Sequence, residues 1–201
     1  MVDIPSPFGG RDAEPFDAYD EFVPEHVPEP GPALDGHDVL AGRRHLAVHR
    51  LARALFAERG VYDMTFGYNL ARLNCDVRHP DAGFRYAVET GGDDATADRA
   101  VLRAEFTPTT EFCPQGLTLT RAAFRAWNGL ADRHEYDLVR VRVAPTHQQT
   151  AAINEELAAL EGEFLATGEL PDEDGGGPGA GAGEPATDRE TGRGRESGTP
   201  F

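Results

Sequence analysis

Alternation of apolar and polar residues marks three strands in the middle of the chain. Phe84, Tyr86 and Val88 are separated by single residues of a different kind, and this two-residue period is typical of a strand with one buried face. The same period recurs at two places further along the chain. We therefore predict strands over residues 84–88, 102–106 and 139–143, the first two joined as a hairpin.

Three other segments repeat apolar residues every three or four positions, which is the period of a helix with one buried face. In the first of them, Val48, Leu51 and Leu55 share this spacing and Gly60 is a natural helix stop. Residues 61–83 show no clear period and are interpreted as loop and short structure. Helices are predicted over residues 38–60, 114–131 and 153–164.

The resulting order is α-β-β-α-β-α, which predicts a small α+β domain with a mixed sheet of about three strands packed against helices. Its last two strands and the helix between them form a crossover unit whose strands are parallel. Cys113 follows the end of the first of these strands and His147 follows the end of the second. We therefore expect Cys113 and His147 to lie at the same edge of the sheet.

The charge of the chain is concentrated at its ends. The 201 residues include 35 acids against 19 arginines and no lysine, for a net charge of −16, a bias that resembles proteins of salt-accumulating organisms. Residues 1–37 hold nine acids, one arginine and seven prolines, and residues 169–201 hold eight acids and a glycine-rich run. Neither end has enough apolar surface to offset its ordering entropy. We predict two disordered acidic tails around a single domain, residues 38–168, which begins with a helical extension.

The composition also argues against several classes of protein. No run of about 18 apolar residues could span a bilayer, and no basic region followed by an apolar stretch marks a secretory signal, so we expect a cytoplasmic protein without membrane contact. Cys75 and Cys113 have no disulfide or metal-binding spacing, which favours reduced thiols. No basic stripe emerges along the sequence, which argues against nucleic-acid binding.

Cys113 nevertheless has the features of a reactive thiol. Pro114 favours a helix that begins directly after Cys113, where unpaired N–H groups stabilise an anion and lower the pKa of a thiol. Thr146 followed by Gln149 fits a capping box, which places His147 at a helix start as a neutral imidazole able to accept a proton or ligate a metal. The alternative is that neither residue is reactive. Cys113 would then be buried and pack as a small apolar side chain, and His147 would be a solvated loop residue.

Two further pairs of residues have a spacing of four, which can place metal ligands on one side of a helix. They are His45 with His49, and Cys75 with His79. Neither pair has a third ligand at a motif spacing. We expect the pair His45 and His49 to lie on a solvated helix face.

Two blocks of the sequence resemble a known family. AEFTPTTEFC, residues 104–113, and THQQTAAINEEL, residues 146–157, are similar to the MIP18 or DUF59 family of iron–sulfur cluster assembly factors, most of all to its eukaryotic-type branch. The resemblance covers residues 101–160, and the Asp-Pro-Glu segment that normally precedes the first strand of the family has no counterpart. The matching residues are Phe106, Thr107, Pro108, Thr109 and Cys113 in the first block, and Thr146, His147, Ala152, Ile153, Asn154 and Leu157 in the second.

The resemblance implies a protein without catalytic turnover, which works with the iron–sulfur assembly machinery and its apoprotein clients. It implies a cluster-transfer or docking site in which Cys113 is the reactive thiol and possible iron ligand. An iron–sulfur cluster normally takes four protein ligands, so any cluster on this chain would be transient, or bridged to a partner or to a second copy in a homodimer. The expected site residues are Thr109, Cys113, Thr146, His147 and Asn154, the last of which fixes the helix start or contacts a partner.

Two alternatives stay open at this point. One is a thiol-dependent enzyme with Cys113 as nucleophile and His147 as base. The other is a non-catalytic adaptor that keeps the fold without the cluster chemistry.

Overall fold

A four-stranded mixed sheet forms the centre of the protein. The computed structural model describes residues 26–91 and 96–170, so most of the two predicted tails lies outside the described residues. The strand order is β1-β4-β5-β6, with β1 (Asp38–Val39) and β5 (Val101–Thr107) antiparallel to β4 (Gly83–Val88), and β6 (Leu138–Val143) parallel to β5. The α+β class, the hairpin and the parallel crossover are confirmed, and β1 adds a fourth strand to the three that were predicted.

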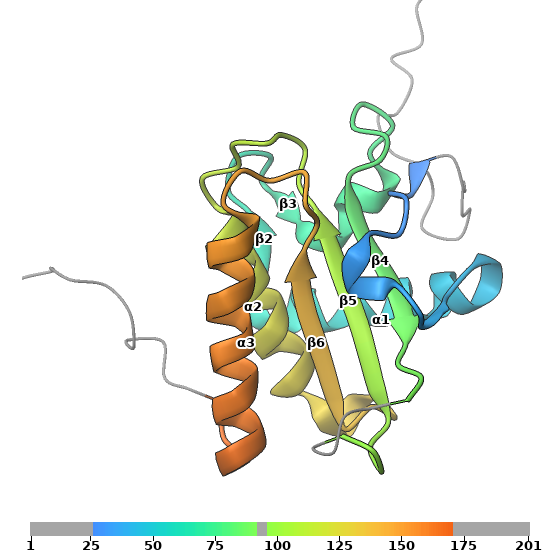
Figure 1. Ribbon diagram of the computed structural model, residues 1–201. Helices are drawn as coiled ribbons and strands as arrows, with labels where there is room; N and C mark the ends of the chain where they lie inside the picture. Colours follow the sequence, from blue (N-terminus) through green and yellow to red (C-terminus); the bar gives the residue numbers. More distant parts are fainter. Residues whose placement is uncertain (1–25, 92–95, 171–201) are drawn as a thin grey trace, which may run out of the picture. The chain divides into compact units, whose positions relative to one another are not determined.

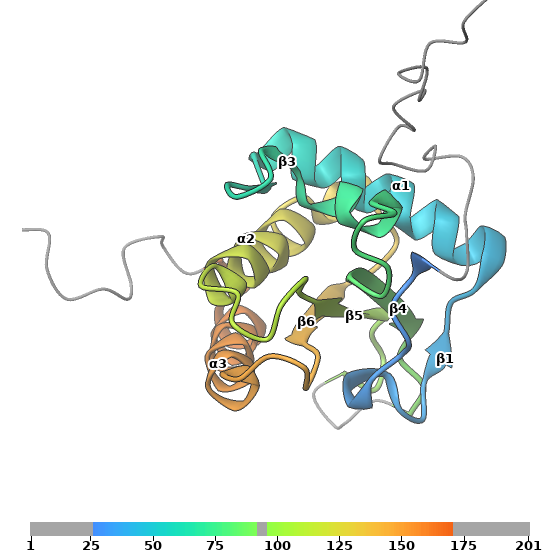
Figure 2. The ribbon, with the colours of Figure 1, turned by 90° about the horizontal axis from the view of Figure 1, so that it is seen from above.

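Helices cover one face and one edge of this sheet (Figures 1 and 2). Helices α1 (Gly42–Arg59) and α2 (Gly116–Asn128) lie on the same face, and α3 (Thr150–Thr167) lies beside the edge strand β6. The first helix begins later than predicted because residues 38–39 pair with β4, and Gly42 starts the helix after that strand.

The segment between α1 and β4 folds into short elements, as its lack of period indicated. Strands β2 (Tyr62–Asp63) and β3 (Tyr68–Asn69) form a small hairpin, and the 3-10 helix η3 (Leu70–Cys75) follows. η3 packs against both α1 and β4. It is joined to the sheet by Asn74, whose side-chain amide exchanges two hydrogen bonds of 2.8 Å with the backbone of Phe84.

The hydrophobic core fills the space between the sheet and helices α1 and α2. Phe84, Phe106, Phe124 and Trp127 are each no more than 1% exposed, and all four rings pack face to edge or at a tilt against neighbouring aromatic rings. Phe124 and Trp127 both lie on α2, so one side of this helix belongs to the core. Burial of such large rings is the main favourable contribution to the stability of a domain of this size.

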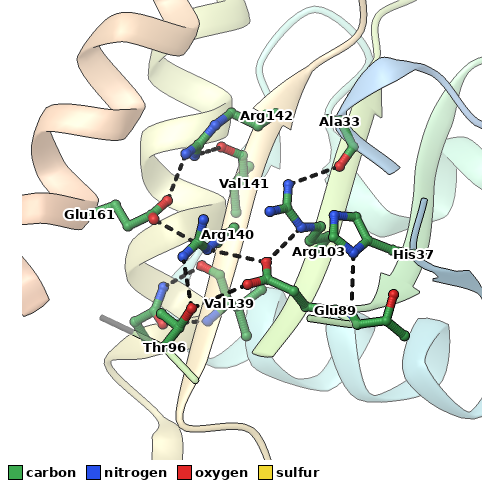
Figure 3. Close-up of polar contacts among 12 residues, drawn as sticks. Ala33, His37, Glu89, Thr96, Arg103, Val139, Arg140, Val141, Arg142 and Glu161 are labelled. Carbon is green, nitrogen blue, oxygen red and sulfur yellow. Dashed lines mark hydrogen bonds and ion pairs between the residues drawn. The ribbon is translucent and has the colours of Figure 1, made fainter. Parts of the chain in front are cut away.

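The opposite face of the sheet is charged (Figure 3). Arg103 on β5 donates to Glu89 at 2.6 Å, and Arg140 on β6 lies 3.4 Å from the same carboxylate. Arg140 and Arg142 also contact Glu161 of α3, at 3.3 and 2.7 Å. The two contacts with Glu161 join α3 to the sheet.

Residues 26–37 were assigned to the N-terminal tail, whereas the structure packs them on the charged face. The 3-10 helix η2 (Pro32–Leu34) contacts β5, and Leu34 is 1% exposed. The Glu105 carboxylate accepts hydrogen bonds from the N–H groups of Gly31 and Ala33, at 2.6 and 3.0 Å. The Pro-rich composition indicated disorder, but this segment binds to a buried side chain from a distant strand. The 3-10 helix η4 (Ala131–Arg133) links α2 to β6. Within residues 26–91 and 96–170, no helix is long and apolar enough to cross a bilayer.

Candidate functional site

Two loops meet at the carboxyl ends of the parallel strands β5 and β6. The loop after β5, residues 108–115, leads into α2, and the loop after β6, residues 144–149, leads into α3. Backbone hydrogen bonds join them: Ala144 N–H donates to Phe106 C=O, and Gln148 N–H donates to Glu111 C=O, both at 2.9 Å. The expected meeting of Cys113 and His147 at one edge is therefore confirmed.

His147 uses both of its ring nitrogens, one for a bond within its own loop and one for a bond to the loop of Cys113. Nδ1 accepts a hydrogen bond from Gln149 N–H at 3.0 Å, so the proton of the neutral ring is on Nε2, which donates to the Cys113 carbonyl oxygen at 2.9 Å. The ring is 4% exposed, and a Cβ at Gly116 would lie 3.2 Å from Nε2. His147 thus contacts the backbone of Cys113 and has no nitrogen left to accept the proton of the thiol.

The thiol of Cys113 is half-buried and packs against the edge of the core. Its predicted position at a helix cap is wrong, because α2 begins at Gly116 with Gln115 as the N-cap residue. Burial raises the pKa of the Cys113 thiol, and hydrogen bonds from the N–H groups of Gln115 and Gly116 only partly offset this effect. The predicted lowering of the pKa is therefore also wrong, since desolvation outweighs the helix start.

Thr109 and Thr146 lie on the rim of an open hollow of about 450 Å³ next to the joined loops. His79 and Pro80 line its other side. Thr146 is exposed and does not cap α3, whose N-cap residue is Gln149. The predicted capping box is wrong because the chain makes one further turn before α3 begins. In this turn, His147 N–H donates to the Ala144 carbonyl.

Asn154 holds the start of α3 against the end of β6. Its Oδ1 accepts from Val143 N–H at 2.7 Å, and its Nδ2 donates to Val143 C=O at 3.0 Å. Of the two roles expected for Asn154, the structure shows the one that fixes the helix.

Two large apolar side chains near Cys113 were not predicted from the sequence. Phe112 is 67% exposed and Met64 is 80% exposed. Gln115 links the loop to the β2–β3 hairpin, where its side chain accepts from Met64 N–H at 3.4 Å and donates to Thr65 Oγ1 at 3.0 Å. The available signal was a phenylalanine beside the cysteine in an otherwise polar loop.

The other candidate residues lie away from this edge. His45 and His49 are 1% and 3% exposed, so the predicted solvated face is wrong. Their rings stack with centroids 6.2 Å apart, and His49 Nε2 lies 3.7 Å from the Cys75 sulfur. Burial lowers the pKa of His45 to about 3 and that of His49 to about 4. Cys75 contacts His49 and not His79, whose ring packs against Phe66.

Within the described part of the chain, no group of three or more histidine, cysteine or acidic side chains is arranged to hold a metal ion. The other thiol, Cys75, contacts His49 of α1. The candidate site therefore presents one thiol, framed by Phe112, Met64 and the threonine-lined hollow.

Comparison with curated proteins and with solved structures finds no match. A family model described as "Domain of unknown function (DUF7998)" matches residues 14–171, which include the whole candidate site and all of its supporting elements. The chain belongs to this family of domains of unknown function, DUF7998.

Proposed function

We propose that this protein is a cytoplasmic iron–sulfur cluster assembly or targeting factor that assists cluster transfer to apoproteins through Cys113. The observation in favour is that the two sequence blocks of the MIP18/DUF59 resemblance build one site. Residues of the second block contact the loop of the first directly, through His147 with Cys113 and Gln148 with Glu111. The site offers a half-exposed thiol on a loop fixed from two sides.

A cluster on this site is cargo shared with another molecule. Cys113 supplies one thiolate, whereas a cluster normally takes four ligands, so the others come from the assembly machinery, a client or a second copy of this chain. The raised pKa keeps the thiol protonated at neutral pH. Binding to iron removes this proton, because a coordinating thiol is deprotonated. The thiol is therefore inert until iron reaches it, which suits a transfer site.

The apolar side chains around the thiol fit a docking role. Phe112 and Met64 expose most of their surface on either side of the Gln115 link, and exposed apolar patches often mark protein interaction sites. This observation also favours the adaptor alternative, in which the same surface binds a partner without a cluster. The enzyme alternative requires His147 to accept the proton of the Cys113 thiol. In the structure, Nε2 of His147 contacts the Cys113 carbonyl oxygen instead of the thiol.

Anaerobic reconstitution with iron and sulfide tests the proposal, with absorbance and native mass as readouts. With a small thiol in the buffer to supply the remaining ligands, we expect wild type to take up a cluster bridged between the Cys113 thiolates of two chains, and Cys113→Ala to stay colourless. Cys75→Ala is the matched control, because it removes the other thiol and should leave the uptake unchanged. Circular dichroism of each variant checks that the fold is kept.

Two outcomes would redirect the interpretation. A colourless wild type that still binds apoprotein clients through Phe112, with binding lost in Phe112→Ser, indicates the adaptor. Equal cluster uptake by wild type and Cys113→Ala contradicts the role proposed for this thiol.

A further inference from the structure

A second hollow, which we call the α1 cleft, lies at the end of the sheet opposite the Cys113 site. It is bounded by the first half of α1, the end of β4 and the segments that lead into β5 and β6. The loops of the Cys113 site follow the other ends of β5 and β6, where the arrowheads lie in Figure 1. The α1 cleft has a volume of about 400 Å³, which is typical of a small-molecule site. Its lining residues are Leu40, Arg44, Ala47, Val48, Val88, Ala100, Glu135 and Tyr136.

The floor of the α1 cleft is apolar. Leu40 and Val48 are buried, and Val88 packs against the same core. Leu40 is held in place by its N–H group, which donates to the Tyr86 carbonyl at 2.8 Å. An apolar group that covers these side chains would be removed from water, and this removal favours binding.

One wall of the cleft is fixed by hydrogen bonds within the protein. Ala100 N–H donates to the Asp137 carboxylate, and Asp137 N–H donates to the Ala100 carbonyl, both at 2.8 Å. Next to this pair, Tyr136 N–H donates to Nδ1 of His134 at 3.2 Å, and the two rings pack with centroids 5.8 Å apart. A site whose residues are already positioned loses less entropy when a ligand binds.

The rim of the cleft carries one basic and one acidic side chain near the same ring. Arg44 donates from Nη1 and Nη2 to the two oxygens of Asp38, at 3.2 and 2.6 Å. Asp38 therefore occupies one side of the guanidinium group, and the fork made by Nε–H and a neighbouring N–H fits a further carboxylate. Arg44 and Glu135 both act electrostatically on the phenol of Tyr136, so the two opposite charges lie close together.

The Tyr136 hydroxyl adds a donor to this rim. Within residues 26–91 and 96–170, the hydroxyl makes no hydrogen bond. Burial and the nearby Glu135 raise the pKa of Tyr136, so the phenol keeps its proton at neutral pH. The cleft thus combines an apolar floor, two donors for an anionic group and one acceptor for a cationic group.

We propose that the α1 cleft binds a free α-amino acid with a large apolar side chain, such as leucine. The ligand carboxylate accepts hydrogen bonds from Arg44 and from the Tyr136 hydroxyl, and the ligand ammonium group donates to Glu135. The apolar side chain of the ligand packs on the floor of the cleft. A ligand with a single charge would leave one of the two charged side chains of the rim without a partner. The inference goes beyond the proposed function and does not depend on it, because the Cys113 site lies at the other end of the sheet.

Calorimetric titration of the full chain with leucine and two analogues tests the proposal. N-acetylleucine lacks the ammonium group, and leucinamide lacks the carboxylate. We expect each analogue to bind at least about tenfold more weakly than leucine, because each loses a hydrogen bond to a charged group. Amide NMR spectra recorded during the leucine titration should shift first at the residues that line the cleft.

Substitutions in the cleft assign each contact. Glu135→Gln should weaken leucine binding by about tenfold or more without weakening that of N-acetylleucine, and Arg44→Gln should do the same without weakening that of leucinamide. Ala47→Phe fills the cleft and should abolish binding. The matched control is Ala54→Phe, at another exposed alanine of α1 that does not line the cleft. Circular dichroism checks that each variant keeps its fold.

Three results would overturn the proposal. The first is that neither leucine nor phenylalanine at millimolar concentration produces heat or NMR shifts. The second is leucine binding that Ala47→Phe leaves unchanged, which places the ligand elsewhere on the protein. The third is equal affinity for leucine, N-acetylleucine and leucinamide, which means that the charges of the rim do not recognise the ligand.

Discussion

The thiol of Cys113 and the imidazole of His147 meet through a backbone carbonyl, and this single contact changes the chemistry available to both residues. The ring of His147 orients the loop, and the thiol retains its proton because it is half-buried. The same effect is stronger at His45 and His49, which are uncharged at neutral pH because they are buried. At the scale of the residue, desolvation decides the protonation state at each of these positions.

Alkylation of Cys113 should show its raised pKa. We expect its reaction with iodoacetamide to accelerate through a midpoint above the free-cysteine pKa of roughly 8.5, measured by peptide mass spectrometry between pH 6 and 10. Cys75 serves as the internal control, because it is 5% exposed and should react only after unfolding. A midpoint below that of free cysteine would mean that the helix start outweighs burial.

The buried histidines should make the protein sensitive to mild acid. Both pKa values are lowered, chiefly by burial, so the unfolded chain binds more protons and the free energy of unfolding falls as the pH drops from 6.5 towards 4. The expected slope is at most about 1.4 kcal/mol per pH unit for each histidine, measured by urea unfolding. The double variant His45→Gln, His49→Gln should flatten this dependence, and an unchanged slope would contradict the assignment.

At the scale of the element, side-chain amides protect the edge of the sheet. Asn154 pairs with the backbone of Val143, and Asn128 pairs in the same way with Val139, at 2.8 and 2.9 Å. Val139 and Val143 both belong to β6, the edge strand beside α3. An unpaired edge strand invites association with another chain, so these asparagines close the edge and fix the two helices that flank it.

Removal of one such amide should destabilise the fold. Asn154→Ala leaves both backbone groups of Val143 without their partner and should cost about 1–3 kcal/mol of unfolding free energy. Asn154→Asp should cost a comparable amount, because a carboxylate can accept from Val143 N–H but cannot donate to its carbonyl. Urea denaturation measures both, with exposed Glu155→Ala as the control that should change little.

At the scale of the whole molecule, the N-terminal segment closes the charged face of the sheet. Glu105 is 1% exposed and binds Gly31 and Ala33, while Arg103 donates to the Ala33 carbonyl at 3.1 Å. Burial raises the pKa of Glu105, and the two backbone hydrogen bonds oppose this. The segment therefore depends on a carboxylate that lies more than seventy residues away in the sequence.

Two glycine substitutions should separate this contact from general effects on stability. A Cβ at Gly31 would lie 2.5 Å from Glu105 Oε1, so Gly31→Ala should lower the unfolding free energy by about 1–3 kcal/mol. Gly162→Ala on the exposed side of α3 meets no atom within 4 Å and should raise it by roughly 0.5–1 kcal/mol. Thermal unfolding compares the two variants. Equal shifts of the unfolding temperature in the same direction would contradict the role of Glu105 in binding the segment at Gly31.

The sequence by itself determined the main strands, the helices and the edge at which Cys113 and His147 meet, because apolar periods and the parallel crossover rule depend on local order. It could not predict β1, which is two residues long, or the docking of residues 26–37, because both depend on distant strands. Only the tertiary structure decided the state of the site, since the burial of Cys113, His45 and His49 is set by elements far apart in the chain. Protonation follows from the surroundings of a side chain, and those surroundings exist only once the chain has folded.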